Sequence, residues 1–415
     1  MLLAVAGAMY AQSWDTTGNS MLSGTYYFRQ IYYVIGDEYG DLSEAISIYG
    51  NVSFDGNGNY SITTSSNAEI ADYSFEYEQY YSYGTFTATG TYAIAASGYG
   101  YITSPYATGD VVYGLVSANG VFVGSSTDTT FGYNDMLVAA PVASPLPTAS
   151  SFTGSWTGAV FDLSAGTPED ALGLQFTANP DGNGNLNVAS INGYAGGSSE
   201  LYTQVAGGLK YVFSNGAAVA GFPSSGTLMS GQKYFYFSKD GSFMFGGSPI
   251  TSDTPFDMIV AVKTTATAPA VSGLYYQAGL DNYEGDQDSY FGAFNVIAGG
   301  APQTYLGHQR INDFAGTSVY DYTYSNSIAL SGSTYSSSTA RFTVGAGGST
   351  VLTSGIGPYL GLSVALQAPS ASSTSGITLA GSEVDANGKW SPGTIEHTAS
   401  SDVSVPGMSA VVLRD

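Results

Sequence analysis

The side chains that most often carry out catalysis are scarce in this sequence. It contains no cysteine and two histidines, His308 and His397, which excludes a thiolate nucleophile, a zinc–thiolate site and a multi-histidine metal site. A serine hydrolase needs a base beside its nucleophile, and the sequence has no Gly-x-Ser-x-Gly elbow. Its 32 acidic residues allow so many carboxylate pairs that none is singled out for glycoside hydrolysis. We predict that the protein is not an enzyme.

One acidic segment has the composition of a calcium site. Residues 281–288 include four carboxylates, on Asp281, Glu284, Asp286 and Asp288. Ca²⁺ takes several oxygen ligands from flexible acidic loops, although this spacing does not match an EF-hand. We therefore expect an acidic loop here, with these four residues as candidate metal ligands. The alternative is a solvated loop without a metal, and no other cofactor is expected.

Tyrosine is unusually frequent, with 34 Tyr beside 20 Phe. One dense cluster is the candidate ligand-binding surface: Tyr73, Phe75, Tyr77, Tyr80, Tyr81 and Tyr83. Tyrosine offers a large contact area with few rotatable bonds, so this cluster suits stacking on sugar rings or contact with another protein. The alternative role is structural, because aromatic cross-strand pairs stabilise a sheet by about 0.2–1 kcal/mol each.

The elements that must position these residues are β-strands. Tyr73, Phe75 and Tyr77 alternate with polar residues, which is the period of a half-buried strand. Asp-Gly and Asn-Gly pairs between such runs predict tight hairpins, at 55–56, 119–120, 181–182, 215–216 and 240–241. Strong helical periodicity is absent. The sequence therefore predicts an all-β protein.

Similar segments recur three times along the chain. Residues 23–27, 153–157 and 272–276 open alike, and residues 134–141, 256–263 and 360–367 close alike. Repeats of this kind indicate tandem structural units. The first two units also share an Asp-Gly-Asn-Gly-Asn turn and a later hairpin at 116–124 and 237–246. The third unit has no clear copy of that hairpin, so we expect it to be shorter.

These repeats divide the chain into a signal-peptide remnant at 1–12, β units at 13–141, 150–264 and 270–368, and a C-terminal β segment at 376–415. The stretches between units are rich in Pro, Ala, Ser and Thr, which is typical of semi-rigid linkers that pack little. About eight strands in succession favour an up-and-down barrel in each unit, because closure removes the sheet edges. A two-sheet sandwich is the alternative.

Charge and the N-terminal segment bear on location. With 9 basic and 32 acidic residues, the net charge of −23 argues against binding to nucleic acid or to an anionic membrane surface. Residues 2–11 form an apolar run followed by small-residue cleavage patterns, which predicts a signal peptide whose basic n-region is missing. No later segment is long and apolar enough for a transmembrane helix. We expect an exported protein.

Two resemblances accompany these patterns. The S-G-x-Y-Y openings, the hairpin at 238–248 and the V-A-x-x-x-P closings resemble those of secreted bacterial β-repeat proteins of unassigned function. In the tail, residues 377–382, 384–390 and 403–413 resemble the C-terminal β-domain of glucuronidase-like glycoside hydrolases. The second resemblance implies export and a polysaccharide setting. It brings no active-site residue with it.

Together these features favour an exported, non-catalytic structural or adhesive protein of the cell surface or the extracellular space. Its expected partners are an extracellular protein, a polysaccharide or further copies of the same chain. Two alternatives are kept: a carbohydrate-binding accessory module, and an outer-membrane β-barrel, which also has alternating strands rich in Gly and Tyr.

Overall fold

The computed structural model describes residues 14–369, apart from gaps at 127–132, 197, 254, 284–285, 297–302, 313–318, 332–333 and 338, and four short strands beyond residue 374. Residues 1–12 of the expected signal peptide and residues 403–413 of the tail lie outside the described residues. The described chain is all-β, as predicted, with short 3-10 helices at Asn19–Met21, Thr64–Ser66, Ala149–Ser151 and Pro168–Asp170. Among the described residues, no helix could cross a membrane.

The first unit is a ring of strands with a hairpin attached. Its strands are β1 (Ser23–Ile35), β2 (Leu42–Asp55), β3 (Asn59–Ile62), β4 (Glu69–Ser74), β5 (Gln79–Thr85), β6 (Ala88–Ile94), β7 (Tyr99–Thr103), β8 (Val111–Val116), β9 (Phe122–Ser125) and β10 (Tyr133–Pro141). They pair in the order β1-β10-β9-β8-β7-β6-β3-β2, and β1 also pairs with β2, which closes the ring. The long β2 pairs with β3 near one end and with β4 near the other, so the β4–β5 hairpin projects from the ring.

The second unit is an open, curved sheet. Its strands are β11 (Ser155–Asp162), β12 (Leu172–Ala178), β13 (Val188–Ala195), β14 (Tyr202–Val205), β15 (Lys210–Ser214), β16 (Ala217–Phe222), β17 (Gly231–Phe237), β18 (Phe243–Gly247) and β19 (Asp257–Thr264). They pair in the order β14-β13-β12-β11-β19-β18-β17-β16-β15. The sheet therefore leaves β14 and β15 as its two edges.

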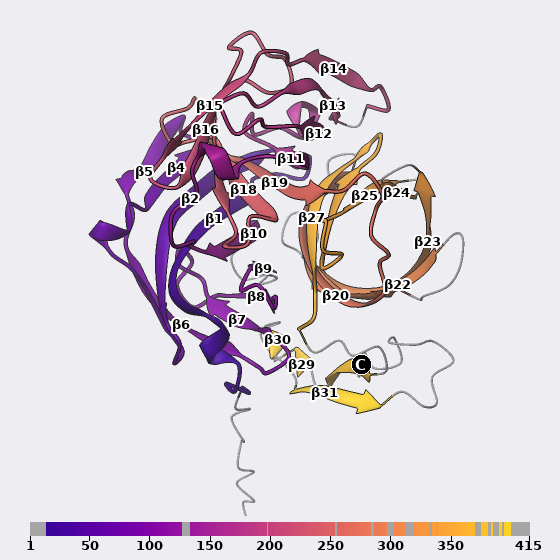
Figure 1. The fold of residues 1–415 in the computed structure, drawn as a ribbon. Coiled ribbons are helices and arrows are strands. Elements are labelled where there is room, and N and C mark those ends of the chain that lie inside the picture. The colour runs from indigo at the N-terminus through magenta and orange to yellow at the C-terminus, as the bar shows by residue number, and fades with distance from the viewer. Residues whose placement is uncertain are drawn as a thin grey trace, which may run out of the picture.

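The third unit is a closed up-and-down barrel, which confirms the predicted architecture most directly (Figure 1). Its strands pair in chain order: β20 (Gly273–Tyr283), β21 (Asp286–Val296), β22 (Gln303–Asn312), β23 (Val319–Ser331), β24 (Thr334–Ser336), β25 (Ala340–Val344), β26 (Thr350–Gly355) and β27 (Tyr359–Gln367). With eight strands the third unit is shorter than the first and second units, which have ten and nine, in line with the expectation from its missing hairpin copy. In the tail, the backbone pairs β28 (Ser375–Ala380) with β31 (Thr394–Ala399) and β29 (Glu383–Val384) with β30 (Trp390–Ser391).

The repeated openings and closings in the sequence correspond to one repeated strand pair. In each unit the first strand pairs antiparallel with the last strand in the same register. Tyr26 is opposite Pro141 in the first unit, Trp156 is opposite Lys263 in the second, and Tyr275 is opposite Gln367 in the third. The similar sequences thus encode the seam at which each unit joins its own beginning to its own end.

The three units share one apolar core, so they pack against one another although the stretches that join them are mostly exposed or half-buried. Side chains on the outer faces of all three units are buried together, among them Tyr33 and Met136, Phe161 and Met258, and Leu280. The rings of Tyr27 and Tyr236 stack at 4.3 Å between the first and second units, and those of Tyr99 and Tyr276 lie 5.5 Å apart between the first and third. The last strands are apolar on both faces because one face fills the unit and the other packs against its neighbours.

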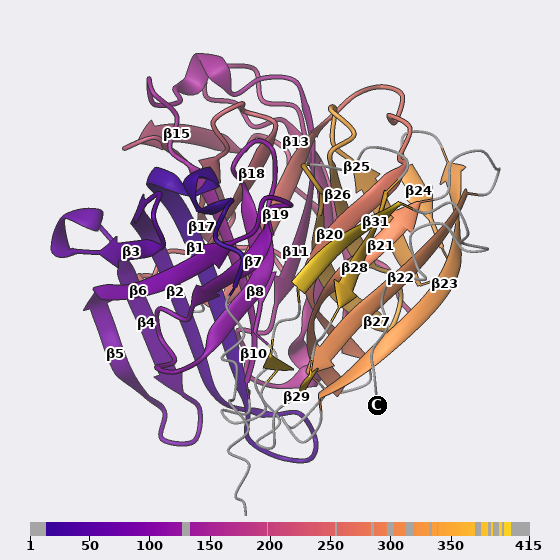
Figure 2. The same cartoon turned by 90° about the horizontal axis from the view of Figure 1, so that it is seen from below.

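The arrangement of the units follows from this core. Strand β20 of the third unit lies against β8, β9 and β10 of the first, and β26 and β27 lie against β11 of the second. Figure 2 shows the same body from below, with the third barrel (orange to yellow) beside the first unit. The outward-facing residues Leu274, Tyr276, Ala278 and Leu280 of the third barrel are therefore covered by protein.

A buried cation joins the first unit to the second. Arg29 on β1 has no exposed surface, and its guanidinium donates to the carbonyl oxygens of Asp257 at 2.6 Å and of Pro255 at 2.9 Å. It also lies 3.3 Å from the carboxylate of Asp257, whose other oxygen accepts a 2.7 Å bond from Lys233. A buried charge is tolerated only when it is paired and hydrogen-bonded in this way. This cluster fixes the position of β1 against β19.

Candidate binding sites

The six aromatic residues proposed for ligand binding lie together on the β4–β5 hairpin and the turn that joins its strands. Tyr73 packs its ring 5.2 Å from Phe75 and 5.0 Å from Tyr80, and Tyr80 lies 5.0 Å from Tyr83. Tyr77 and Tyr81 lie 6.4 Å apart. The sequence cluster is thus also a cluster in space, at the side of the first unit where β5 is labelled in Figure 1.

The cluster has an inner and an outer part. Tyr73 and Phe75 are partly buried and pack against the shared core, with the ring of Phe75 close to Gly166 of the second unit. Tyr77, Tyr80, Tyr81 and Tyr83 are instead 59%, 39%, 50% and 53% exposed. We name these four residues the tyrosine face. Tyr73 and Phe75 thus anchor the hairpin to the core, and the tyrosine face remains exposed to solvent.

Strand β5 is also an edge of its sheet. Among the described strands it pairs only with β4, so its outer backbone groups face no neighbouring strand. The sequence of β5, Gln-Tyr-Tyr-Ser-Tyr-Gly-Thr, contains no charge and no proline. Natural edge strands usually carry such residues to prevent pairing with another chain. An aromatic edge without them is suited to docking.

The acidic segment at 281–288 is a hairpin end and not the loop we expected. Strands β20 and β21 run through Tyr283 and Asp286, with Asp281 directly opposite Asp288 in the ladder. Glu284 lies outside the described residues, and of Asp286 only the backbone is described. The strand pairing continues through these acidic residues, and Asp281 and Asp288 line a cavity of about 290 Å³ inside the barrel.

The paired aspartates influence each other. Burial and the neighbouring charge of Asp288 raise the pKa of Asp281 well above its usual range. The rings of Tyr283 and Tyr359 stack at 4.4 Å beside them. Within the described residues no group of three or more His, Cys, Asp or Glu side chains is placed to hold a metal ion. Calcium binding at this segment stays a prediction.

A second carboxyl pair lies inside the first unit. Tyr106 donates its hydroxyl to Asp72 at 2.9 Å and lies 3.2 Å from Glu44. Burial, followed by the nearby carboxylate of Asp72, raises the pKa of Glu44 to about 7. Deeper in the unit, burial raises the pKa of Asp135 to about 6, although Ser126 and Gln30 donate hydrogen bonds to it. Each of these carboxyl groups has at least one hydrogen-bond partner, and the Oδ1 atom of Asp72 is buried without one.

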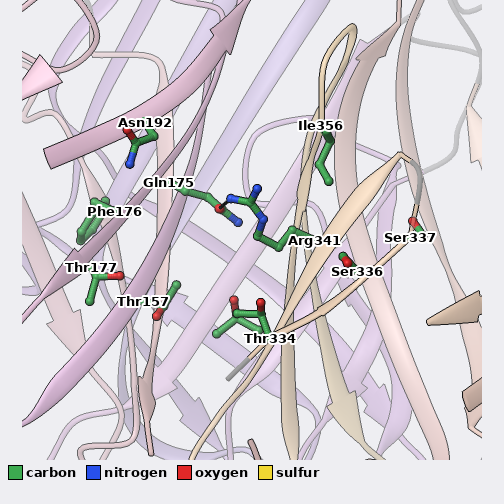
Figure 3. A pocket seen from close by; sticks show the side chains of 11 residues that line it. Thr157, Gln175, Phe176, Thr177, Asn192, Thr334, Ser336, Ser337, Arg341 and Ile356 are labelled. Atoms are coloured by element: carbon green, nitrogen blue, oxygen red, sulfur yellow. Dashed lines mark hydrogen bonds between the residues drawn. The ribbon is translucent and has the colours of Figure 1, made fainter. Parts of the chain in front are cut away.

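A polar cavity that the sequence does not predict lies between the second and third units. It has a volume of about 490 Å³ and lies between β11–β13 and β24–β26 (Figure 3). One wall carries Thr157, Gln175, Thr177 and Asn192, and the other carries Arg341 and hydroxyl side chains. In the sequence these residues read as the polar positions of alternating strands. Their convergence depends on how two units pack, for which the sequence holds no local signal.

The histidines add nothing to these sites that can be described. His308 and His397 fall on β22 and β31, for which the backbone pairing alone is described.

Comparison with known proteins identifies no family. No family model matches the chain, and no curated protein matches it. Among solved structures it is similar to a double mutant of transferrin binding protein B from Haemophilus parasuis Hp5, at 10% identity and a TM-score of 0.26 over 83% of this chain and 75% of that chain. It is also similar to isotype 1 transferrin binding protein B from serogroup B Neisseria meningitidis, at 10% identity and a TM-score of 0.24, with the same coverage.

These likenesses are too distant to carry an argument about function. The resemblance of the tail to glucuronidase-like glycoside hydrolases is not supported by any of these comparisons. The function proposed below therefore rests on the residues of this chain.

Proposed function

We propose that this chain is an exported, non-catalytic protein of the cell surface or the extracellular space, and that it acts by contact. The tyrosine face of the β4–β5 hairpin is its contact surface for another polypeptide. The observation that supports this proposal is the exposure of four tyrosines, at 39–59%, on an uncharged strand at a sheet edge.

The chemistry of the surface favours a binding role. Tyrosine is enriched in protein interfaces because its ring buries a large area while its hydroxyl stays hydrogen-bonded. Here each ring already contacts a neighbouring ring, as in the Tyr80–Tyr83 pair at 5.0 Å. A partner therefore meets a surface whose side chains lose little conformational entropy on binding.

The backbone of β5 favours a polypeptide over a polysaccharide. An extended peptide can add a strand to an open sheet edge, with main-chain hydrogen bonds providing affinity and the side chains providing specificity. A sugar chain stacks on aromatic rings but cannot continue the ladder. The open backbone edge of β5, which lies beside exposed aromatic rings, therefore suits a polypeptide partner.

The test is an adhesion assay with beads that carry the full chain. Beads are mixed with beads carrying the same chain, with beads carrying extracellular matrix proteins, and with beads carrying neutral or acidic polysaccharides. We expect clustering in a protein arm, reduced at least about tenfold in Tyr77→Ser/Tyr81→Ser/Tyr83→Ser, since truncating a single hot-spot tyrosine costs about 2 kcal/mol or more and tenfold corresponds to about 1.4 kcal/mol.

A matched control keeps the result specific. Val205→Ser/Val212→Ser removes side chains that are 80% and 65% exposed on β14 and β15, the edge strands of the second unit. This variant should cluster like the wild type. Clustering with polysaccharide beads alone would replace our proposal with the carbohydrate-binding alternative. Equal clustering by the triple variant would remove the tyrosine face from consideration.

A further inference from the structure

The cavity between the second and third units is built from two polar faces that meet. Thr157 is opposite Thr177 in the β11–β12 ladder, and Gln175 is opposite Asn192 in the β12–β13 ladder, so the four side chains share the outer face of the second unit. Across the gap, Arg341 is opposite Ser336 and Ser354 on the outer face of the third barrel. Further along the same strands these outer faces turn apolar, with Ala159 and Leu352 in the shared core.

Arg341 is the charged side chain of this cavity. Its guanidinium donates to the Gln175 side-chain oxygen at 2.6 Å, and Gln175 donates in turn to the hydroxyl of Ser354. The ion pairs among the described residues both involve Asp257, so the partner of Arg341 is a neutral amide. No acidic residue lines the cavity. A guanidinium has five donors in a rigid fork that matches a carboxylate, and one neutral acceptor leaves most of that capacity available.

The remaining lining residues supply neutral hydrogen-bonding groups. Thr157, Thr177, Thr343, Ser336 and Ser337 contribute hydroxyls, and Asn192 contributes an amide. Figure 3 shows Arg341 and Gln175 meeting near the centre of the cavity, with Thr157, Thr177 and Thr334 on one side of them. The ring of Phe176 is buried in the interior of the second unit, so no exposed aromatic face is available for stacking. A ligand here is held by hydrogen bonds and by one positive charge.

We infer that this cavity binds an acidic sugar: a hydroxyl-rich ring that carries a carboxylate, alone or within a short oligosaccharide. The carboxylate pairs with Arg341, and the ring hydroxyls exchange hydrogen bonds with the threonine, serine and asparagine side chains. A volume of about 490 Å³ lies within the range of small-molecule sites. The inference is independent of the tyrosine face, which lies on the first unit.

The experiment is isothermal titration calorimetry of the full chain at low salt with the trimer of galacturonic acid. The methyl-esterified trimer is the matched probe, since it keeps the ring hydroxyls and lacks the charges. We expect the acid to bind at least about tenfold more tightly than the ester, because a charge-assisted fork is much stronger than a neutral bond. Equal affinities, or no heat with either trimer, would overturn the inference.

Variants then assign the binding to the cavity. Arg341→Gln should weaken the acid about tenfold, to the level of the ester, whereas Lys239→Gln removes a charge from an exposed turn and should leave the affinity within about twofold. Because Arg341 also links two units, Thr177→Val serves as a second variant that keeps the Arg341–Gln175 bond. Thr177→Val should weaken the binding of both trimers several-fold. Unchanged affinities in both cavity variants would place the binding elsewhere and refute the inference. Tyr81→Ala, on the tyrosine face, should leave the affinity for both trimers unchanged.

Discussion

At the scale of single residues, the protein keeps several carboxyl groups inside its units. They follow from the repeated seam: Tyr32 is opposite Asp135, Asp162 is opposite Asp257, and Asp281 is opposite Gly361 at equivalent positions of the three strand pairs. Asp135 and Asp257 each accept a hydrogen bond from the backbone N–H of a serine nine residues earlier. The same serine-to-aspartate hydrogen bond thus fixes the segment before the last strand in the first and second units.

These buried carboxyls predict how stability changes with pH. Burial and Asp72 raise the pKa of Glu44 to about 7, so the folded chain holds this proton more tightly than the unfolded chain does. The resulting stabilisation is complete below the ordinary carboxyl pKa of about 4.3 and is lost as the pH rises through about 7. Asp135, with a pKa of about 6, acts in the same direction. We expect the unfolding temperature to fall between about pH 4.5 and pH 7.

The variant Glu44→Gln should flatten part of this slope, measured by scanning calorimetry at a series of pH values. Glu38→Gln removes a charge from an exposed position of the β1–β2 turn and should keep the wild-type slope. Identical slopes in both variants would show that Glu44 does not titrate as argued. Below about pH 4 we expect the unfolding temperature to fall again as the pH decreases. Although burial acts to raise the pKa of Asp257, the charges of Lys233 and Arg29 lower it below its usual value. Protonating Asp257 in the folded chain is therefore unfavourable.

At the scale of elements, the Asp-Gly-Asn-Gly-Asn turns show how a short motif specifies a hairpin. The carboxylate of Asp55 accepts hydrogen bonds from the backbone of Asn57 at 2.7 Å and of Asn59 at 3.0 Å, and the side chain of Asn59 completes the set. Asp181 makes the same contacts in the second unit. The turn is thus closed by its own side chains, and Gly56 supplies a φ of 76°.

Replacing this glycine tests the argument. Gly56→Ala places a Cβ in the left-handed region, which should reduce the free energy of unfolding by about 1–2 kcal/mol, measured by urea denaturation. Gly207→Ala is the matched control, since its new Cβ would meet no atom within 4 Å and its φ is not positive. That change should be neutral or stabilise by up to about 1 kcal/mol. Equal effects at both positions would contradict the assigned role of Gly56.

Features that are local in sequence could be predicted, and features that depend on packing between units could not. The hairpin turns, the seam motifs and the clustering of Tyr73–Tyr83 follow from patterns within a few residues. The loop expected at 281–288 is a strand pair, because Asp281 and Asp288 are ladder partners inside a barrel that only the third unit's closure creates. The cavity around Arg341 and Gln175 joins residues 166 positions apart on two units, so no local pattern indicates it.

At the scale of the whole molecule, the shared core should make the units unfold together. Trp14 packs 4.8 Å from Tyr101 in the first unit, and Trp156 is buried in the second. With Trp390 changed to Phe, variants that retain only Trp14 or only Trp156 report on one unit each. In each variant the fluorescence midpoint in urea should coincide with the midpoint from far-UV circular dichroism of that same variant, because separating the units exposes the core residues of both. Distinct midpoints would mean that the units unfold independently.

A change in the third unit extends this test. Leu280 is fully buried in the shared core, so Leu280→Ala should lower both midpoints, with a loss of about 2–5 kcal/mol. If neither midpoint falls, the third unit unfolds independently of the first and second units. A matched substitution inside the second unit, Val188→Ala, should also lower both if unfolding is cooperative.

The seam of each unit also determines how the chain would respond to a pulling force. Because first and last strands are antiparallel neighbours, the chain comes in and goes out at the same end of every unit, at Tyr26 and Pro141, Trp156 and Lys263, and Tyr275 and Gln367. Tension on the two termini therefore peels each seam open one residue pair after another, and never shears all pairs at once. Once the shared core separates, each unit would unfold at low force, and the chain would lengthen by about 3.3–3.6 Å for each unfolded residue. If the chain acts by contact as proposed, a load on its termini would extend it before the force on the bound surface rises.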